Sequence, residues 1–359
     1  MQSTITTAVI GAVVGAVAVW TALKMTNKKS QKIPPSDDFT CKEATPNPTT
    51  VDGWLTLATT RMKIVVPPKQ SSFRVYAILT WRDSQSGVEG FVSGTNSETS
   101  FIGGSLCAER AAAVQLRELP ATVVVTAVYL TSDLVGTPIT PGVLCREYLL
   151  SCVSPDVPIW LTTADMSVKR VTSLKELYPF PSLYCGKARD ELEHCGKAAS
   201  LLIYDIDQSR RFSLTNQGSK SSWLHLISIA IQASQQDDLG SAMHPIHYGA
   251  ALEYSDGSII SSCQKAGLEY GTTIDAVTSL LRDIDMKRSI AEGPTPVKLV
   301  QVDQYGNLHA PFAPARAQLY ERGNEKLNCL VMSSSTGERT EVTVESLVPD
   351  CPTMCEIWG

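Results

Sequence analysis

An uninterrupted apolar run lies near the start of the chain. Residues 5–23 include no charged side chain, and four lysines follow between residues 24 and 32. A helix of about 20 apolar residues crosses a hydrocarbon core of roughly 30 Å, and Trp20 near one end suits the membrane interface. No charged region precedes the run, so we expect a retained anchor over residues 1–26 rather than a cleaved signal peptide.

The pattern of apolar and polar residues changes twice after the anchor. Residues 27–50 are polar and proline-rich, without apolar periodicity, and we expect a linker there. Residues 73–96 then show two β-rich apolar stretches around a polar turn, which predicts a hairpin. An alanine-rich helix should begin near Cys107, a buried strand should span 121–132, and a loop from Pro141 should enter a second helix. A further strand at 157–163 gives the order β-β-α-β-α-β, which favours a mixed sheet covered by helices.

The same pattern returns in the second half of the chain. Residues 247–281 are expected to form a hairpin and then a helix, with Asp256-Gly257 as the turn. The segment TSLKELYP at 172–179 has a counterpart, TVESLVP, at 343–349. This regularity predicts a duplicated domain, with copies over 51–190 and 191–359.

Composition narrows the classes of partner. The net charge is −5 and no long basic block is present, so nucleic acid is not an expected partner. The ten cysteines are scattered, which indicates reduced thiols or metal ligands rather than a disulfide framework.

Four short motifs in the first copy occur in a known order. Asn96-Ser97-Glu98 lies eleven positions before Cys107, which opens the run Cys-Ala-Glu-Arg. Pro141 to Glu147 reads PGVLCRE, and TSLKELYPF follows. These motifs resemble those of the cytidine deaminases. The resemblance implies two tandem cytidine-deaminase-like αβα domains with mixed sheets, in addition to the membrane helix.

In that family a zinc ion is held by three protein ligands, and a glutamate carries protons. The resemblance implies Cys107 and Cys145 as ligands and Glu109 as the general acid/base. The third ligand should stand at Gly142, which has no side chain to offer. We therefore expect no cofactor, with zinc bound only if the site still functions. The resemblance also implies substrate contacts from Phe73 to the pyrimidine and from Asn96 and Glu98 to the ribose.

Other departures from the family pattern concern single positions. In the first copy Tyr76 replaces a glycine and Glu147 replaces a glutamine, both at positions that we interpret as facing substrate. In the second copy Asp275, Val277, Phe312 and Ala315 stand at the catalytic positions. We expect that copy to be structural. Family sites are built across domain boundaries, so it should shape or plug the first pocket.

Three functions remain open. The first is a catalytically impaired accessory subunit of a membrane assembly, which contacts lipid through residues 5–23 and other protein subunits elsewhere. Reduced cysteines and a single N-terminal span favour the mitochondrial inner membrane, within a respiratory complex. The second is an active zinc-dependent cytidine or deoxycytidine deaminase tethered to a membrane. The third is a nucleoside-binding sensor without chemistry.

Overall fold

A computed structural model describes residues 47–182, 190, 191, 194, 222–236, 246–289, 293–333 and 336–352 of the chain. Contacts separate residues 1–47 from residues 48–359, and the fold below belongs to the second of these units. The anchor expected over residues 1–26 lies outside the described residues. Among the helices within them, none is both long and apolar enough to cross a membrane.

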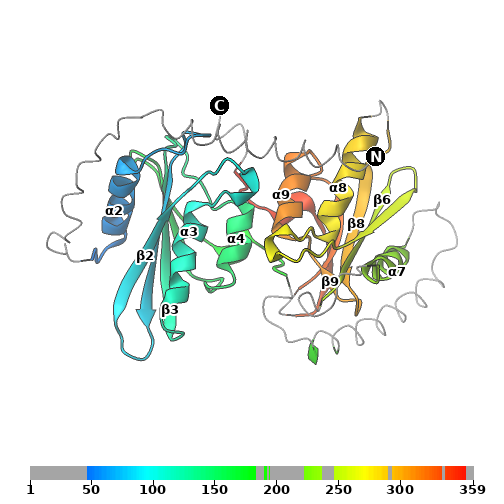
Figure 1. Cartoon of the computed structure of the whole chain (residues 1–359), viewed down its shortest axis with the longest axis horizontal. Coiled ribbons are helices and arrows are strands. Elements are labelled where there is room, and N and C mark those ends of the chain that lie inside the picture. The colour runs from blue at the N-terminus through cyan, green and yellow to red at the C-terminus, as the bar shows by residue number, and fades with distance from the viewer. Residues whose placement is uncertain are drawn as a thin grey trace, which may run out of the picture. The chain divides into compact units, whose positions relative to one another are not determined.

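The first copy is a five-stranded sheet with helices on both faces (Figure 1). Its strand order is β2-β1-β3-β4-β5, and only the β3–β4 pair is parallel. In chain order its main elements are α2 (Val51–Ile64), β1 (Val75–Asp83), β2 (Glu89–Thr95), α3 (Ala108–Gln115), β3 (Val123–Ser132), α4 (Val143–Leu149), β4 (Pro158–Thr162), β5 (Lys169–Ser173) and α5 (Leu174–Leu177). The predicted hairpin, the two helices and the mixed sheet are therefore confirmed.

The second copy repeats this topology. Its strand order is β7-β6-β8-β10-β11, the β8–β10 pair is parallel, and a short strand β9 also pairs with β8. Its elements are α7 (Trp223–Ser234), β6 (Tyr248–Tyr254), β7 (Ile259–Cys263), α8 (Ala276–Arg288), β8 (Pro296–Asp303), β9 (Leu308–His309), α9 (Ala313–Glu321), β10 (Asn328–Met332), β11 (Arg339–Thr343) and α10 (Val344–Leu347). The turn at Asp256-Gly257 is confirmed, and Gly257 has the positive φ of 87° that favours glycine.

Each sheet has a different apolar cluster on its two faces. In the first copy Ala77 and Leu79 of β1 pack on the α3 side, whereas Tyr76 and Ile78 pack on the α2 side. This alternation is the period-2 pattern of a strand buried on both faces. The second copy has the same arrangement, with α8 on one side of β6 and α7 on the other (Figure 1).

This layering corrects the interpretation of Tyr76. Its side chain lies beside Trp54 on the α2 face and its hydroxyl donates to Ser93 at 2.9 Å, so it does not face the α3 side where the motifs meet. The equivalent Gly249 lies under α7, where a Cβ would be 1.9 Å from the carbonyl oxygen of Ala230. The size of this residue is therefore set by how closely a helix packs on the sheet, and not by substrate.

Two buried arginines join the copies symmetrically. Arg146 in α4 and Arg316 in α9 are both fully buried and lie 316 − 146 = 170 positions apart. Arg146 donates to the carbonyls of Pro141, Leu177, Pro349 and Asp350 and to the hydroxyl of Thr140. Arg316 donates to the carbonyls of Pro311, Leu347, Pro179 and Phe180. Each arginine thus binds the segment that ends its own copy and the segment that ends the other.

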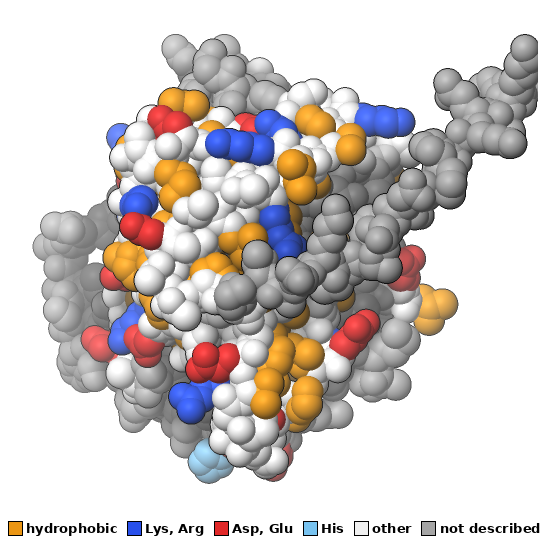
Figure 2. Space-filling view, turned by 90° about the vertical axis from the view of Figure 1, so that its left-hand side faces the viewer, with side chains coloured by type: hydrophobic (Ala, Val, Ile, Leu, Met, Phe, Trp, Pro, Cys, Tyr) orange, Lys and Arg blue, Asp and Glu red, His pale blue; other side chains and the backbone are white. Residues whose placement is uncertain are grey.

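The described surface on one face of the molecule carries both positive and negative side chains. Figure 2 shows acidic and basic side chains interspersed over one face of the molecule, with apolar side chains between them. Neither sign forms a continuous patch on the described part of that face.

Candidate functional site

The first turns of α3 and α4 bring three candidate residues together. Cys107 is the N-cap of α3, Glu109 lies in the first turn of that helix, and Cys145 lies in α4. Their sulfur and carboxylate ligand atoms all lie within 4.8 Å of one another. Cys145 and Glu109 are buried, and Cys107 is half-buried. A helix N-terminus favours negative charge, so this position stabilises a thiolate on Cys107.

The two sulfur atoms differ in charge state. A hydrogen bond from Cys145 and the Arg110 guanidinium, whose Nη2 is 3.4 Å from Sγ, lower the pKa of Cys107 to about 6. The same hydrogen bond, together with burial, raises the pKa of Cys145 well above its usual value. The hydrogen bond thus favours the thiolate form on Cys107 and the thiol form on Cys145.

The pKa of the Glu109 carboxyl group is higher than that of an exposed glutamate. Burial is the main cause, and the negative charge of Cys107 adds to it, so that the pKa of Glu109 is raised to about 7. A carboxyl group that titrates near neutral pH is suited to general acid/base work. Both the identity of Glu109 and its buried surroundings therefore suit the acid/base role that the resemblance implies.

The position of the third expected ligand is open space. Gly142 is the N-cap of α4, and a Cβ built there meets no atom within 4 Å. A metal ion could still be held by the two cysteines and the carboxylate of Glu109, since all three are groups that zinc accepts. Glu109 would then no longer be free to carry protons. The residues present fit a metal ion, but they do not fit a metal ion together with the family's acid/base.

A pocket of about 340 Å³ surrounds this cluster, and both copies line it. The first copy contributes the three residues above, Gly142, Asn96 and Glu98. The second copy contributes Ala317 and Glu321 of α9, followed by Cys351 and Pro352 near the end of the described chain. The expectation that the second copy shapes the first pocket is therefore confirmed.

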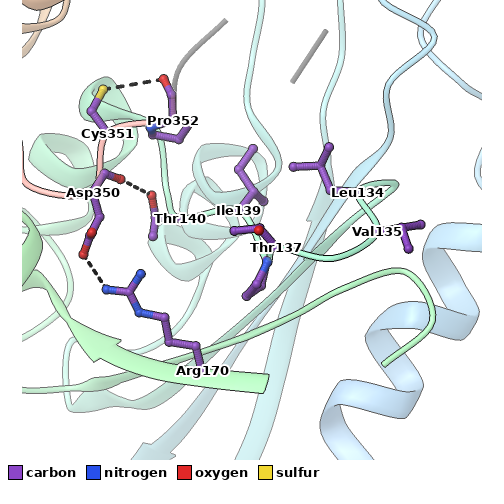
Figure 3. Close-up of a pocket in the computed structure, with 10 residues that line it drawn as sticks. Leu134, Val135, Thr137, Ile139, Thr140, Arg170, Asp350, Cys351 and Pro352 are labelled. Atoms are coloured by element: carbon purple, nitrogen blue, oxygen red, sulfur yellow. Dashed lines mark hydrogen bonds and ion pairs between the residues drawn. The ribbon is translucent and has the colours of Figure 1, made fainter. Parts of the chain in front are cut away.

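The segment from Asp350 to Pro352 is also a wall of a neighbouring pocket of about 200 Å³ (Figure 3). The backbone carbonyl of Asp350 accepts from the hydroxyl of Thr140 at 2.6 Å, and its carboxylate pairs with Arg170 of β5. Cys351 and Pro352 line both pockets and so separate them. These bonds to the first copy fix the segment of the second copy that closes the cluster's pocket.

The residues expected to bind ribose reach the pocket, but their polar groups are occupied. Asn96 accepts from the backbone N–H of Val75 and donates to the carbonyl of Phe73, at 2.9 and 2.8 Å. Both carboxylate oxygens of Glu98 accept from Ser71, from its backbone N–H and its hydroxyl. These bonds hold the loop that leads into β1.

Two other residues that were expected to contact substrate do not line this pocket. Phe73, assigned to the pyrimidine, is not among the residues that line the pocket. Glu147 does not face it either, because its carboxylate accepts from the N–H of Ala313 at 2.9 Å, where α9 begins. The interpretation of Glu147 as a substrate-side residue is corrected: it caps a helix of the other copy. Sequence spacing alone did not reveal that contact.

The corresponding region of the second copy is filled. The ring of Tyr248 makes edge-on contacts with His309 and Phe312, with centroids 5.1 and 4.9 Å apart. Phe312 occupies the position of Gly142, and Asp275 occupies that of Cys107. The carboxylate of Asp275 accepts from the backbone N–H of Thr278 and so caps α8. Both replacements stabilise local structure; Phe312 has no group that binds a metal ion, and the two carboxylate oxygens of Asp275 accept from the N–H and the hydroxyl of Thr278.

Solved structures that resemble the chain include cytidine deaminases. The enzyme from Mycobacterium leprae is 22% identical, with 36% of this chain and 99% of that chain covered and a TM-score of 0.30. The enzyme from Burkholderia pseudomallei is 24% identical, with 37% and 98% covered and a TM-score of 0.32. The enzyme from Mycobacterium tuberculosis is 22% identical, with 37% and 98% covered and a TM-score of 0.31. No protein-family model and no curated protein sequence matches the chain.

Proposed function

We propose that the chain is a cytidine-deaminase-like protein that has lost hydrolytic deamination. The proposal rests on one observation: the reaction needs four side chains, three as zinc ligands and one as proton carrier, and only three are present in this cluster. Zinc, when bound, would supply an activated water, and it needs three protein ligands and a separate proton carrier. Here Cys107, Cys145 and Glu109 must serve both purposes, and Gly142 leaves open space.

We further propose that the protein works as a membrane-anchored accessory subunit. The second copy supports this role, because the positions that match Cys107 and Gly142 hold a helix-capping aspartate and a phenylalanine in aromatic packing. The anchor expected over residues 1–26 would hold the protein at a membrane, with the mitochondrial inner membrane as the proposed location and protein subunits of a respiratory complex as the proposed partners. Under this proposal the protein retains the fold and its surfaces, but it no longer catalyses deamination.

A nucleoside-binding sensor is the second candidate. The pocket volume of about 340 Å³ falls in the range of sites that take small molecules. Against it, Asn96 and Glu98 are already hydrogen-bonded to the loop before β1. Calorimetry with cytidine and with uridine separates the two, since a sensor must release or absorb heat with one of them, and the heat must depend on Asn96 and Glu98.

The loss of the third ligand is tested by restoring it. Gly142→Cys should place a third thiol in open space beside the pair, at a backbone position with ordinary φ of −60°. We expect zinc analysis by mass spectrometry to give far less than one zinc per wild-type chain and about one per Gly142→Cys chain. Gly271→Cys is the matched control, because a Cβ there also meets no atom within 4 Å but lies in the second copy.

Deaminase activity with cytidine and deoxycytidine should be measured on the same three proteins. One zinc per wild-type chain, lost in Cys107→Ala and accompanied by turnover, would contradict the proposal and establish an enzyme. The accessory role is tested separately by mild detergent extraction. A chain that leaves the membrane only as a free monomer or dimer would contradict that role.

A further inference from the structure

We propose that Cys107 and Cys145 act as a reversible dithiol, which closes to an intramolecular disulfide by exchange with small-molecule disulfides such as oxidised glutathione. The two sulfur atoms belong to different helices and lie within 4.8 Å of each other. A disulfide bond is about 2.05 Å long, so the pair must close by less than about 3 Å. This inference rests on the proposed function, because a bound metal ion would occupy both sulfur atoms.

The surroundings of the pair leave room for this closure. Gly142, three residues before Cys145, has no atom within 4 Å of a built Cβ, so the start of α4 is not packed tightly against its neighbours on that side. Cys107 is the N-cap of α3 with an extended backbone, and its side chain is not confined by a preceding helical turn. The site that has lost a zinc ligand therefore keeps the space in which the two remaining thiols can move.

The two sulfur atoms are placed for different steps of the exchange. Cys107 is half-buried and lines the pocket, so a small disulfide can reach it. The Nη2 of Arg110, 3.4 Å from its sulfur, holds that atom at the pocket wall. Cys145 also borders the pocket but is fully buried, so its sulfur is less accessible than that of Cys107. Cys107 is therefore the attacking sulfur and Cys145 the resolving one.

The exchange balances without a metal or an enzyme. The sulfur of Cys107 attacks one sulfur of the small disulfide RSSR, forms a mixed disulfide and releases one thiol RSH. The sulfur of Cys145 then attacks the Cys107 sulfur of that mixed bond and releases the second RSH. The protein loses two protons and two electrons, and RSSR gains both to become two RSH. The product links the start of α3 to α4 across the wall of the pocket.

Tryptic digestion separates the relevant thiols cleanly. The sequence places Cys107 alone in peptide 83–110, Cys145 alone in 118–146 and Cys152 alone in 147–169. Cys351, which also lines the pocket, falls in 340–359 with Cys355. The full-length protein in detergent is incubated with oxidised glutathione or with dithiothreitol, and free thiols are then blocked with N-ethylmaleimide. Mass spectrometry of the digest reports every pairing, and metal analysis of the same sample reports zinc.

We expect a linked 83–110/118–146 peptide to be the major form after oxidation and to disappear under dithiothreitol. Cys145→Ala should stop at the glutathione adduct on Cys107, and Cys107→Ala should leave Cys145 reduced. Cys152, half-buried in the same part of the fold, is the internal control and should carry less adduct. Circular dichroism verifies that each variant is folded.

The outcomes separate the two proposals. Stoichiometric zinc with both thiols protected would overturn the proposed function and the dithiol together. Absence of zinc with no linked 83–110/118–146 peptide at any ratio of oxidised to reduced glutathione would overturn the dithiol alone. A link from 83–110 to 340–359 instead would show that Cys351 is the partner and would overturn the assignment of Cys145.

Discussion

Removing the guanidinium of Arg146 is expected to be one of the most destabilising single substitutions in the first copy. Arg146 is fully buried and makes five hydrogen bonds, four of them to backbone carbonyls at 2.7 to 2.8 Å. Two of those carbonyls, of Pro349 and Asp350, belong to the second copy. Arg146→Ala would therefore weaken both the closing segment of its own copy and the contact between the copies.

The magnitude follows from the groups left behind. A buried acceptor that loses its partner costs about 1–3 kcal/mol, which for four carbonyls gives a ceiling near 8 kcal/mol at about 2 each. Two effects reduce it. Water can reach Asp350, which lines a pocket of about 200 Å³, and burial lowers the pKa of Arg146, so removing this charge recovers part of its desolvation cost. We expect a net loss of about 4 kcal/mol in the free energy of unfolding, close to a thousandfold in the equilibrium constant.

The assay is urea unfolding of the full-length protein in detergent, followed by tryptophan fluorescence. Arg146→Lys keeps the charge but offers at most three donors, so we expect it to lose about half as much. Arg117→Ala, an exposed arginine just after α3, is the control and should change stability by less than about 0.5 kcal/mol. A loss below about 1 kcal/mol for Arg146→Ala would refute the claim that this network holds the copies together.

Three further predictions concern single side chains. Because the pKa of Glu109 is raised to about 7, the folded state holds the extra proton between about pH 4.5 and 7, and stability should fall by up to about 3 kcal/mol as pH rises through that window. Glu109→Gln should remove this slope in unfolding experiments between pH 5 and 8, and an unchanged slope would mean that another group causes it. Asn96→Ala should cost about 2 kcal/mol by freeing the N–H of Val75, and Asn96→Asp, which can still accept, should cost less; equal losses would contradict the scaffold role. Asp275→Ala should lower the thermal midpoint by removing a helix cap of about 1 kcal/mol, whereas Asp275→Ser should restore most of it; no change in either would show that the bond to Thr278 contributes nothing.

The sequence predicts the elements that carry a strong period or a motif. The hairpins, α3, α4 and the mixed sheet follow from alternating apolar residues and from turns such as Asp256-Gly257. The helix α2 is missing from the predicted elements, although its apolar residues Val51, Trp54, Leu55, Ala58 and Met62 do recur at helical spacing. Its start is set by the hydroxyl of Thr50, which accepts from the N–H of Gly53, a contact that spacing does not reveal.

The candidate site was only partly predictable for a related reason. Motif order correctly placed Cys107, Glu109 and Cys145 together, since the first turns of two neighbouring helices carry them. It failed for Tyr76 and Glu147, because alignment to a family position does not tell which layer a side chain packs against. Both residues contact a helix, α2 in one case and α9 in the other. The departures from the family pattern at Tyr76 and Glu147 therefore change contacts with neighbouring helices, and not contacts with substrate.

Comparison of the two copies shows which buried groups the fold itself requires. The second copy has replaced each metal or acid/base position, and the replacements at Asp275 and Phe312 add a cap and ring packing in its core. The buried arginine has not been replaced in either copy, and both Asp350 and Phe180, which accept from the arginine of the other copy, have a positive φ near 50°. Loss of a catalytic group costs a folded domain little, whereas loss of a buried guanidinium leaves several carbonyls without donors. Stability alone therefore accounts for the arginine exchange, but it does not require Cys107, Glu109 and Cys145. Under the proposed function, the first copy keeps these three residues for a use other than zinc-dependent deamination.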